Sequence, residues 1–259
     1  MNQRSSGNKV FFLICIIFTL ASLACQLQKT GSSSASDKKN TPKVTSKVKE
    51  ELQPKELTAR EILDKSTEAM KSVKTMSFQL TVTSGSAGIS IEINGEGVVE
   101  QPDKAYLKMD YAGQTIEVLT LSKTEAYIKQ SGSTTWEPIA AEQLNQLVGM
   151  NVDILQQLGI AGFAHEIYLA GTETIEGVDC YYLTFVVDMA KYLAQLGEAG
   201  AQIDVNTSEG TGEFWIDKEG FLMRKFLFNI DAAVQGVTVN ASTDIIMSKF
   251  NEPVEIPSP

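Results

Sequence analysis

The feature that most constrains the fold is a change of hydrophobic period early in the chain. Over residues 62–73 the apolar side chains recur at helical spacing, but from Phe78 onward they alternate with polar ones. Alternation places all apolar side chains on one face of a strand, and it is typical of antiparallel sheets with one dry face and one wet face. The chain is therefore expected to build a sheet whose dry face must be covered.

An amphipathic helix is predicted just before the first strand. Thr58 is followed three residues later by Glu61, which is the spacing of a capping box. The residues that share the apolar face of this helix are Ile62, Leu63, Ser66, Ala69, Met70 and Val73. Lys65, Glu68 and Lys71 fall on the opposite face, so the helix can cover apolar surface on one side only.

Five strands are predicted in the first half, at 78–82, 89–93, 106–111, 115–121 and 126–130. Turns separate them at 85–88, Pro102-Asp103, 112–113 and 122–124. We expect the second strand to continue through Gly95 and Gly97 with a bulge or a sharp bend, because strand glycines often mark such sites. A tight turn at Asn94-Gly95 is the alternative, but it would leave very short arms.

The second half repeats this pattern, with strands predicted at 167–175, 181–187, 212–217, 221–230 and 233–250. Turns are expected at Glu176-Gly177, at 218–220 and at Asp231-Ala232, and helices at 140–150, 152–160 and 189–199. Roughly ten antiparallel strands with three or four helices define an α+β fold with one large sheet, which should curl. The helices are the available cover for its dry face.

The first 25 residues have the layout of a secretory signal that ends at a lipidation site. Arg4 and Lys9 precede the apolar run 10–20, and small residues lead to Cys25. This arrangement resembles a lipobox, so residues 1–24 are predicted to be a cleaved signal peptide and Cys25 to be acylated outside the cytoplasm. The alternative is a retained membrane anchor, but residues 10–24 fall short of the roughly 20 needed to span a bilayer.

Charge divides the rest of the chain. Residues 26–57 are rich in Ser, Lys, Thr and Pro, which predicts a disordered tether with a reach of about 30 Å. This tether carries seven Lys against four acidic residues, whereas the predicted domain, residues 58–259, carries 13 Lys or Arg against 28 Asp or Glu. A basic segment beside the anchor is attracted to an anionic leaflet. The acidic domain lacks the basic surface that nucleic acid requires, which excludes nucleic-acid binding.

The sequence contains no recognisable catalytic or metal-binding motif. His165 is the only histidine, and a lone histidine is usually structural. Cys15 leaves with the signal and Cys25 is acylated, so Cys180 has no partner for an intramolecular disulfide and is expected to be a buried, inert thiol. We therefore predict no enzyme activity, no metal and no cofactor. A hydrolase with paired carboxylates is the least favoured alternative, because the acidic residues fall at polar strand and helix positions.

Apolar side chains are in excess at strand and helix positions. An ordinary packed core explains them, and so does a curled sheet that encloses an apolar cavity. The residues predicted to line such a cavity are Phe78, Leu80, Val82, Ile89, Ile91, Ile93, Leu107, Met109, Ile116, Val118, Leu144, Leu147, Leu155, Leu158, Leu183, Phe185, Leu193, Leu196, Phe214, Ile216, Phe226, Phe228, Ile230, Val237 and Val239.

The order of these elements resembles a known family. The lipobox and tether are followed by the helix 62–74 and the strand 77–82, and later by the strand and turn 212–220 and the closing segment 249–256. This arrangement is similar to the LppX/LprG-type bacterial lipoproteins of the LolA/LolB-like superfamily, over residues 58–256. The resemblance implies an unclosed antiparallel half-barrel, capped by helices over a hydrophobic cavity that holds acyl chains. It implies no catalytic residues.

The favoured function is that of a membrane-anchored lipoprotein that binds acyl chains and carries or presents lipids or lipoproteins in the cell envelope. Its expected partners are a lipid or acylated ligand, the membrane through Cys25, and a transport protein of the envelope, and we expect a monomer. The glycine-jointed helices 140–150, 151–160 and 188–199 are predicted to part as a lid. The alternative is a lipoprotein with a solid core that acts as an interaction or assembly factor.

Overall fold

A computed structural model describes residues 56–140, 162–195, 200–234 and 237–259, in which eleven strands form one antiparallel sheet. The strands of the first half are β1 (Thr75–Ser86), β2 (Ile89–Glu100), β3 (Lys104–Tyr111), β4 (Gln114–Ser122), β5 (Glu125–Gln130) and β6 (Glu137–Ile139). Those of the second half are β7 (Ala164–Ile175), β8 (Val178–Val187), β9 (Glu209–Asp217), β10 (Met223–Val234) and β11 (Val237–Ser248).

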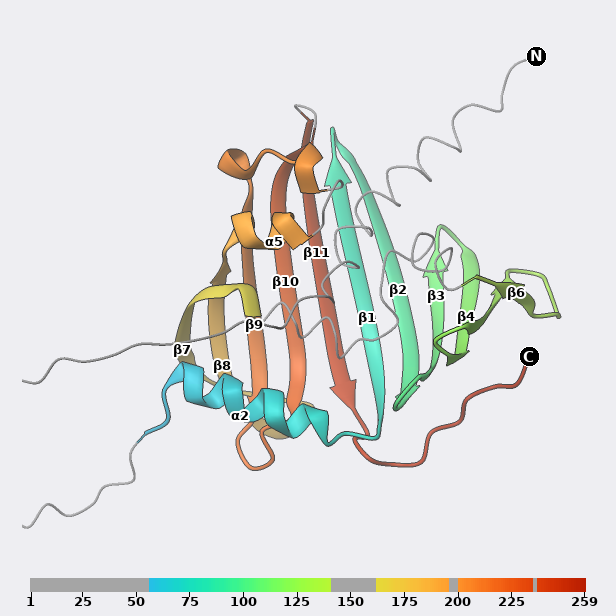
Figure 1. The fold of residues 1–259 in the computed structure, drawn as a ribbon, viewed down its shortest axis with the longest axis horizontal. Coiled ribbons are helices and arrows are strands. Elements are labelled where there is room, and N and C mark those ends of the chain that lie inside the picture. The colour runs from blue at the N-terminus through green and yellow to red at the C-terminus, as the bar shows by residue number, and fades with distance from the viewer. Residues whose placement is uncertain (1–55, 141–161, 196–199, 235–236) are drawn as a thin grey trace, which may run out of the picture.

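The first and last strands meet in the interior of the sheet. The strand order is β6-β5-β4-β3-β2-β1-β11-β10-β9-β8-β7, so each half of the domain is a meander of neighbouring strands (Figure 1). The pairing of β1 with β11 runs from Ser77 opposite Ser248 to Ser86 opposite Val239. Since β6 and β7 form the two edges and do not pair with each other, the sheet is an unclosed half-barrel.

Helix α2 (Ala59–Lys71) crosses one end of the sheet (Figure 1). The predicted capping box is confirmed: the backbone N–H of Thr58 donates to Glu61 Oε2 at 2.8 Å, and Glu61 N–H donates to Thr58 Oγ1 at 3.2 Å. The predicted apolar face of this helix is also confirmed, because Ile62 and Leu63 are buried against the sheet. Outside it, the Lys65 ammonium lies 4.8 Å from the ring centroid of Phe221.

A second group of short helices lies toward the other end. It consists of α5 (Met189–Gln195) and the 3₁₀ turns η2 (Gly200–Gln202) and η3 (Val205–Thr207). Tyr192 of α5 packs edge-on against Phe228 of β10, and the N–H of Asp204, which precedes η3, donates to the carbonyl of Ala233 at 3.1 Å. None of the helices in the described ranges is long and apolar enough to cross a membrane.

The predicted α+β fold class is confirmed, with some differences in the elements. All ten predicted strands are present, and the short β6 is an addition. The predicted turn at Asp231-Ala232 is wrong: β10 continues through both residues to Val234, since Asp231 and Ala232 pair with Asn240 and Val239 of β11. The helix predicted at 189–199 begins as expected, but its residues 196–199 lie outside the described ranges. The helices predicted at 140–150 and 151–160 also lie outside them, apart from residue 140.

The glycines of β2 serve a different purpose from the one predicted. The strand continues through Gly95 and Gly97 as expected, but its pairing with β1 and β3 has no register shift there, so no bulge exists. Gly97 instead faces Phe78 across the β1–β2 ladder. A Cβ on Gly97 would collide with the Phe78 ring and with the carbonyl oxygen of Tyr106. Glycine at this position therefore makes room for an aromatic ring that leans across from the neighbouring strand.

This packing predicts that Gly97→Ala lowers the free energy of unfolding by about 1–3 kcal/mol, as is usual when a well-packed core is overfilled. Gly85→Ala is the matched control in β1, because its Cβ would meet nothing closer than the carbonyl of Ile89 at 3.7 Å. Urea unfolding of the two variants measures the difference. Equal stability of both variants would contradict the role assigned to Gly97.

Candidate functional site

One face of the sheet is apolar along most of its width. On β1, Met76, Phe78, Leu80 and Val82 are buried, while the residues between them are more exposed. Their partners on β11 continue the same face, with Met247 opposite Phe78 and Ile245 opposite Leu80. The face extends through β2 and β3 on one side and through β10, β9 and β8 on the other, and these side chains belong to a single hydrophobic cluster. This surface is the candidate binding site, and we call it the inner face.

Aromatic rings form a continuous row on the inner face. Phe185 of β8 stacks on Phe214 of β9 with ring centroids 4.5 Å apart, and Phe214 stacks on Phe226 of β10 at 5.4 Å. Phe226 is followed by Phe228 at 6.1 Å, with an interplanar angle of 14°. Offset stacking of this kind adds roughly 0.5–1.5 kcal/mol per pair beyond area burial. The rings of this row are buried and contain no polar atom.

The aromatic row ends beneath helix α5. Tyr192 packs edge-on against Phe228 at 5.8 Å and against Phe163 at 5.9 Å. Burial raises the pKa of the Tyr192 hydroxyl above its usual range, since the phenolate cannot be solvated there. At the start of the row, Gly212 lets the Phe185 ring lie over β9, because a Cβ on Gly212 would overlap that ring. Glycine and phenylalanine thus face each other across two strand pairs, Phe78 with Gly97 and Phe185 with Gly212.

Most of the predicted lining residues lie together in the inner-face cluster. Those that are buried in it are Phe78, Leu80, Val82, Ile93, Leu107, Met109, Val118, Leu183, Phe185, Leu193, Phe214, Ile216, Phe226, Phe228 and Ile230. Ile91 and Ile116 are partly buried against the cluster, and Val239 is buried at 9% exposure. Leu144, Leu147, Leu155, Leu158 and Leu196 lie outside the described residues.

Three of the predicted lining residues that the structure describes do not join the cluster: Val239 is buried outside it, whereas Ile89 and Val237 are exposed. Ile89 is 67% exposed and Val237 is 48% exposed, because each is the first residue of its strand, beside a hairpin connection. Conversely, the inner face contains Met76, Ile245 and Met247, which the prediction omitted. The every-second-residue pattern, counted back from Phe78, reaches Met76. Counted forward from Val239, it reaches Ile245 and Met247.

Ser66 is the one polar side chain of α2 that is fully buried, and its hydroxyl has no hydrogen-bond partner in the described structure. Its neighbours on the same helix face, Ile62 and Met70, belong to the apolar cluster. A buried hydroxyl without a partner costs roughly 1–3 kcal/mol. The helix face that covers this end of the inner face therefore contains a buried hydroxyl group without a hydrogen-bond partner in the described structure.

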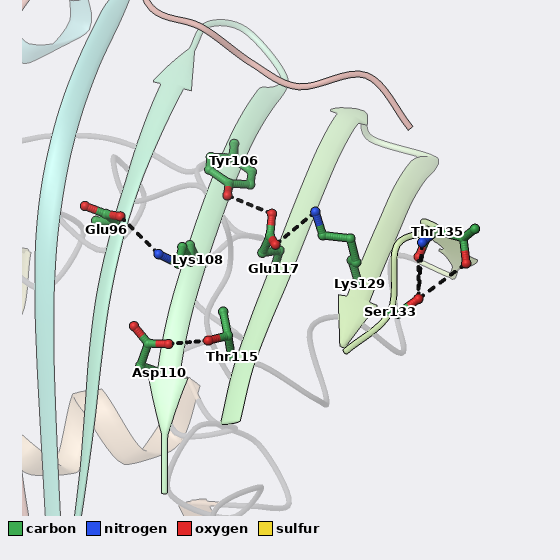
Figure 2. A network of polar contacts seen from close by, with 9 residues as sticks. All are labelled: Glu96, Tyr106, Lys108, Asp110, Thr115, Glu117, Lys129, Ser133 and Thr135. Atoms are coloured by element: carbon green, nitrogen blue, oxygen red, sulfur yellow. Dashed lines mark hydrogen bonds and ion pairs between the residues drawn. The ribbon is translucent and has the colours of Figure 1, made fainter. Parts of the chain in front are cut away.

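The opposite, outer face of the sheet is polar and its charges are paired. Figure 2 shows the group around Glu117 on β3–β5: the Tyr106 hydroxyl donates to Glu117 Oε2 at 2.8 Å, and Lys129 Nζ lies 2.9 Å from Glu117 Oε1. Burial and the bond to Glu117 raise the pKa of Tyr106 to about 12. Burial alone would raise the pKa of Glu117, but the hydrogen bonds from Lys129 and Tyr106 hold it below its usual value. These groups stabilise one another.

The second half of the outer face carries a similar group. Trp215 stacks on Tyr182 at 5.1 Å and donates its indole N–H to Glu173 Oε2 at 2.7 Å. Lys225 Nζ lies over the Trp215 ring at 5.0 Å and 2.9 Å from Asp244 Oδ2. Side chains from β7 to β11 are thereby tied together in a row across the strands, which is the usual way that cross-strand pairs stabilise a sheet.

Cys180 and Asp217 face each other at the β8–β9 pairing. Cys180 is buried and unpaired, as predicted, and burial raises the pKa of its thiol. Asp217 Oδ1 accepts N–H groups from Glu219 and Gly220, and its Oδ2 lies 3.0 Å from Arg224 Nη2. Although burial opposes it, these bonds hold the pKa of Asp217 below its usual value. The carboxylate fixes the β9–β10 turn.

His165 lies exposed near the start of β7. Within the described ranges, no three His, Cys, Asp or Glu side chains come together as a metal site would require. The candidate site is therefore defined by apolar surface and shape, and the fold and the inner face together describe an unclosed half-barrel with a continuous apolar lining.

Comparison with solved structures returns bacterial lipoproteins and a LolA superfamily protein. The chain is similar to the lipoprotein LppX of Mycobacterium tuberculosis, with a TM-score of 0.48 and 16% identity over 76% of this chain and 96% of that one. It is similar to LprF of Mycobacterium bovis, with a TM-score of 0.46 and 16% identity over 78% and 96%. A LolA superfamily protein of Nitrosomonas europaea gives a TM-score of 0.29 and 12% identity over 78% and 96%.

LppX and the LolA superfamily are also the groups named in the resemblance drawn from the sequence. No family model matches the sequence. No curated protein matches it either.

The Asp217 contacts predict a pH-dependent contribution to stability. Because the folded-state pKa of Asp217 is lowered, its contribution is present above the unfolded pKa of about 3.9 and is lost as the pH falls through the folded value. Asp217→Asn should therefore cost about 1–3 kcal/mol at pH 7 and progressively less below about pH 4. Urea unfolding across this range measures the change. Asp179→Asn, at an exposed carboxylate, is the control, and a cost for Asp217→Asn that does not depend on pH would contradict the assignment.

Proposed function

We propose that this chain is a membrane-anchored lipoprotein that holds lipid acyl chains against the inner face and carries or presents lipids or lipoproteins in the cell envelope. The observation that carries the proposal is the continuous apolar inner face of an unclosed sheet, with its row of stacked rings from Phe185 to Phe228. Such a surface offers dispersion contacts along its whole length and no fixed polar partner. That chemistry fits a long hydrocarbon chain, whose methylenes are all alike.

Burial of hydrocarbon would supply the binding free energy at this site, and no catalytic step is involved. Each methylene removed from water contributes roughly 0.8 kcal/mol. Two long acyl chains with about 30 methylenes would together contribute on the order of 20 kcal/mol, which can offset the cost of leaving a bilayer. Ser66 supplies one polar group on this face that lacks a partner in the described structure. Its hydroxyl is the candidate contact for an ester or headgroup oxygen.

The proposed anchor keeps this site near a membrane. Acylated Cys25 and the basic tether 26–57 would hold the domain outside the cytoplasm within about 30 Å of the membrane surface. The acidic domain, with 28 Asp or Glu against 13 Lys or Arg in residues 58–259, would be repelled by anionic headgroups. A tether of this length lets the domain stand away from the membrane and return to it.

A second candidate function has its own observation. Phe214, Leu183 and Val118 have no exposed surface at all, as expected of an inner face that is filled by the protein's own side chains. A lipoprotein with such a solid core would act through its outer surface as an interaction or assembly factor. The two functions differ in whether the inner face has room for a ligand.

The direct test is mass spectrometry of an organic extract of the purified chain from Gln26 to Pro259, which retains every described helix and strand. Lipid in a stoichiometric amount, or saturable binding of a fluorescent fatty-acyl probe, supports the carrier. Repeated absence of both would sink the carrier proposal and leave the solid core.

A filling variant sharpens this test. Val82 lies on the inner face in the middle of β1, and Thr83 is its neighbour on the outer face. If the inner face binds lipid, Val82→Phe should reduce bound probe severalfold with little loss of stability. If the core is solid, Val82→Phe should cost about 1–3 kcal/mol by overpacking and change no binding. Thr83→Phe is the matched control and should alter neither quantity. Probe titration and urea unfolding supply the two measurements.

A further inference from the structure

Three of the five large aliphatic side chains that are exposed in the described residues lie at the end of the sheet opposite α2, and the other two, Leu169 and Val186, lie on β7 and β8. Ile89, Val205 and Val237 are 67%, 41% and 48% exposed. Ile89 opens β2 after the β1–β2 hairpin, Val237 opens β11, and Val205 opens η3. In Figure 1 the β1–β2 and β10–β11 ends lie together at the top, whereas α2 lies at the bottom. We call Ile89, Val205 and Val237 the apolar rim.

The three rim residues are held at the same end of the sheet by strand pairing and hydrogen bonds. Ser86 pairs with Ile89 on one side and with Val239 on the other, and its hydroxyl donates to the carbonyl of Thr238 at 3.1 Å. Beyond them, the N–H of Asp204 donates to the carbonyl of Ala233, which pairs with Thr238. The rim is therefore a built part of the sheet end rather than a set of separate loop tips.

This end of the sheet is nearly free of charge in an otherwise acidic domain. No charged side chain occurs between Thr75 and Ile91 or between Val237 and Thr243. Three acidic groups border it, namely Asp204, Asp231 and Glu209, and Glu209 lies opposite Asp231 in the β9–β10 pairing. Asp204 accepts the N–H of Asn206 as the cap of η3, and Asp231 accepts the side-chain N–H of Asn240. A domain with an excess of acidic residues can approach an anionic leaflet closely only at an end that carries little charge.

We propose that the apolar rim is the membrane-docking surface of the domain, and that its occupant is the interface of a lipid bilayer. Aliphatic side chains beside exposed hydroxyls, such as those of Ser90 and Thr207, match the mixture of acyl chains and ester or phosphate oxygens found at that interface. A basic protein partner would instead be attracted to the parts of the domain where acidic residues are in excess, and not to this nearly uncharged end. This inference rests on the proposed lipid-carrier function and adds the place where the carrier meets the bilayer.

The proposed tether is long enough for this contact. β1 has 12 residues, so the rim lies about 40 Å from the α2 end of this strand. The 32 residues of the tether 26–57 span at most about 110 Å and on average about 30 Å. The domain can therefore turn its rim to the same membrane with moderate extension of the tether. Because a tethered surface experiences a high effective concentration of membrane, three aliphatic side chains suffice for repeated, reversible docking.

The test places a polarity-sensitive fluorophore on single introduced cysteines of the chain 25–259, acylated at Cys25, in phosphatidylcholine vesicles whose acyl chains are brominated. Labels at Ile89→Cys and Val237→Cys should shift to the blue and be quenched. A label at Glu219→Cys, in the turn at the other end of β9 and β10, should not respond. The unsubstituted chain, treated alike, gives the background, since Cys180 is buried. Equal quenching at all three sites, or no quenching at any, would overturn the proposal. So would a blue shift that follows protein concentration rather than lipid, because it would assign the rim to a second copy of the chain.

A paired substitution separates this proposal from the carrier function. Ile89→Glu/Val237→Glu should slow uptake of a fluorescent lipid from vesicles roughly tenfold, while equilibrium binding of a water-soluble acyl probe stays unchanged. Lys123→Gln/Thr124→Glu makes the same change of net charge in the exposed β4–β5 turn and should leave uptake unaffected. If neither the unsubstituted chain nor any variant binds the probe, the carrier function is refuted but the docking proposal is not. Normal uptake by the rim variant would refute docking alone.

Discussion

The structure depends on one constraint: a wide antiparallel sheet with an apolar face cannot leave that face in water. Burial of apolar surface contributes roughly 25 cal/mol per Å², and the inner face carries large side chains on most strands. The sheet does not close, so the cover must come from elsewhere. Helix α2 covers one end with Ile62 and Leu63, and α5 packs Tyr192 against the other. The pairing of β1 with β11 makes one surface of what would otherwise be two separate meanders.

The two faces of the sheet solve opposite problems. On the outer face, water is available and charges are stabilised by short cross-strand contacts, such as those of Glu117 with Lys129 and of Asp244 with Lys225. In each pair one carboxylate oxygen lies about 2.9 Å from the lysine ammonium, which ties neighbouring strands together. On the inner face the rings present no polar atom. The inner face therefore offers apolar contact, whereas the outer face offers polar and charged contacts.

Local sequence patterns predicted the helices and strands well, but they could not predict contacts between one strand and the next. The capping box at Thr58 and the alternation at Phe78 act within a few residues, and both are confirmed. The role of Gly97 depends on Phe78 in the neighbouring strand, so the glycine alone suggested a bulge that does not exist. The residue types at Asp231-Ala232 predict a turn, but pairing with β11 keeps the strand extended there. The exposure of Ile89 also follows from its place beside a hairpin, which alternation cannot reveal.

The manner in which the aromatic side chains pack bears on whether the inner face can receive a ligand. Phe78 and Phe185 each lean over a glycine of the adjacent strand, so their rings lie close to the sheet instead of projecting from it. Phe185, Phe214 and Phe226 then stack with interplanar angles of 14° and 21°, nearly parallel. Rings that filled a core would project and interdigitate with side chains from the opposite layer. Rings laid against the sheet extend less far from it, and the two glycines are what permit this arrangement.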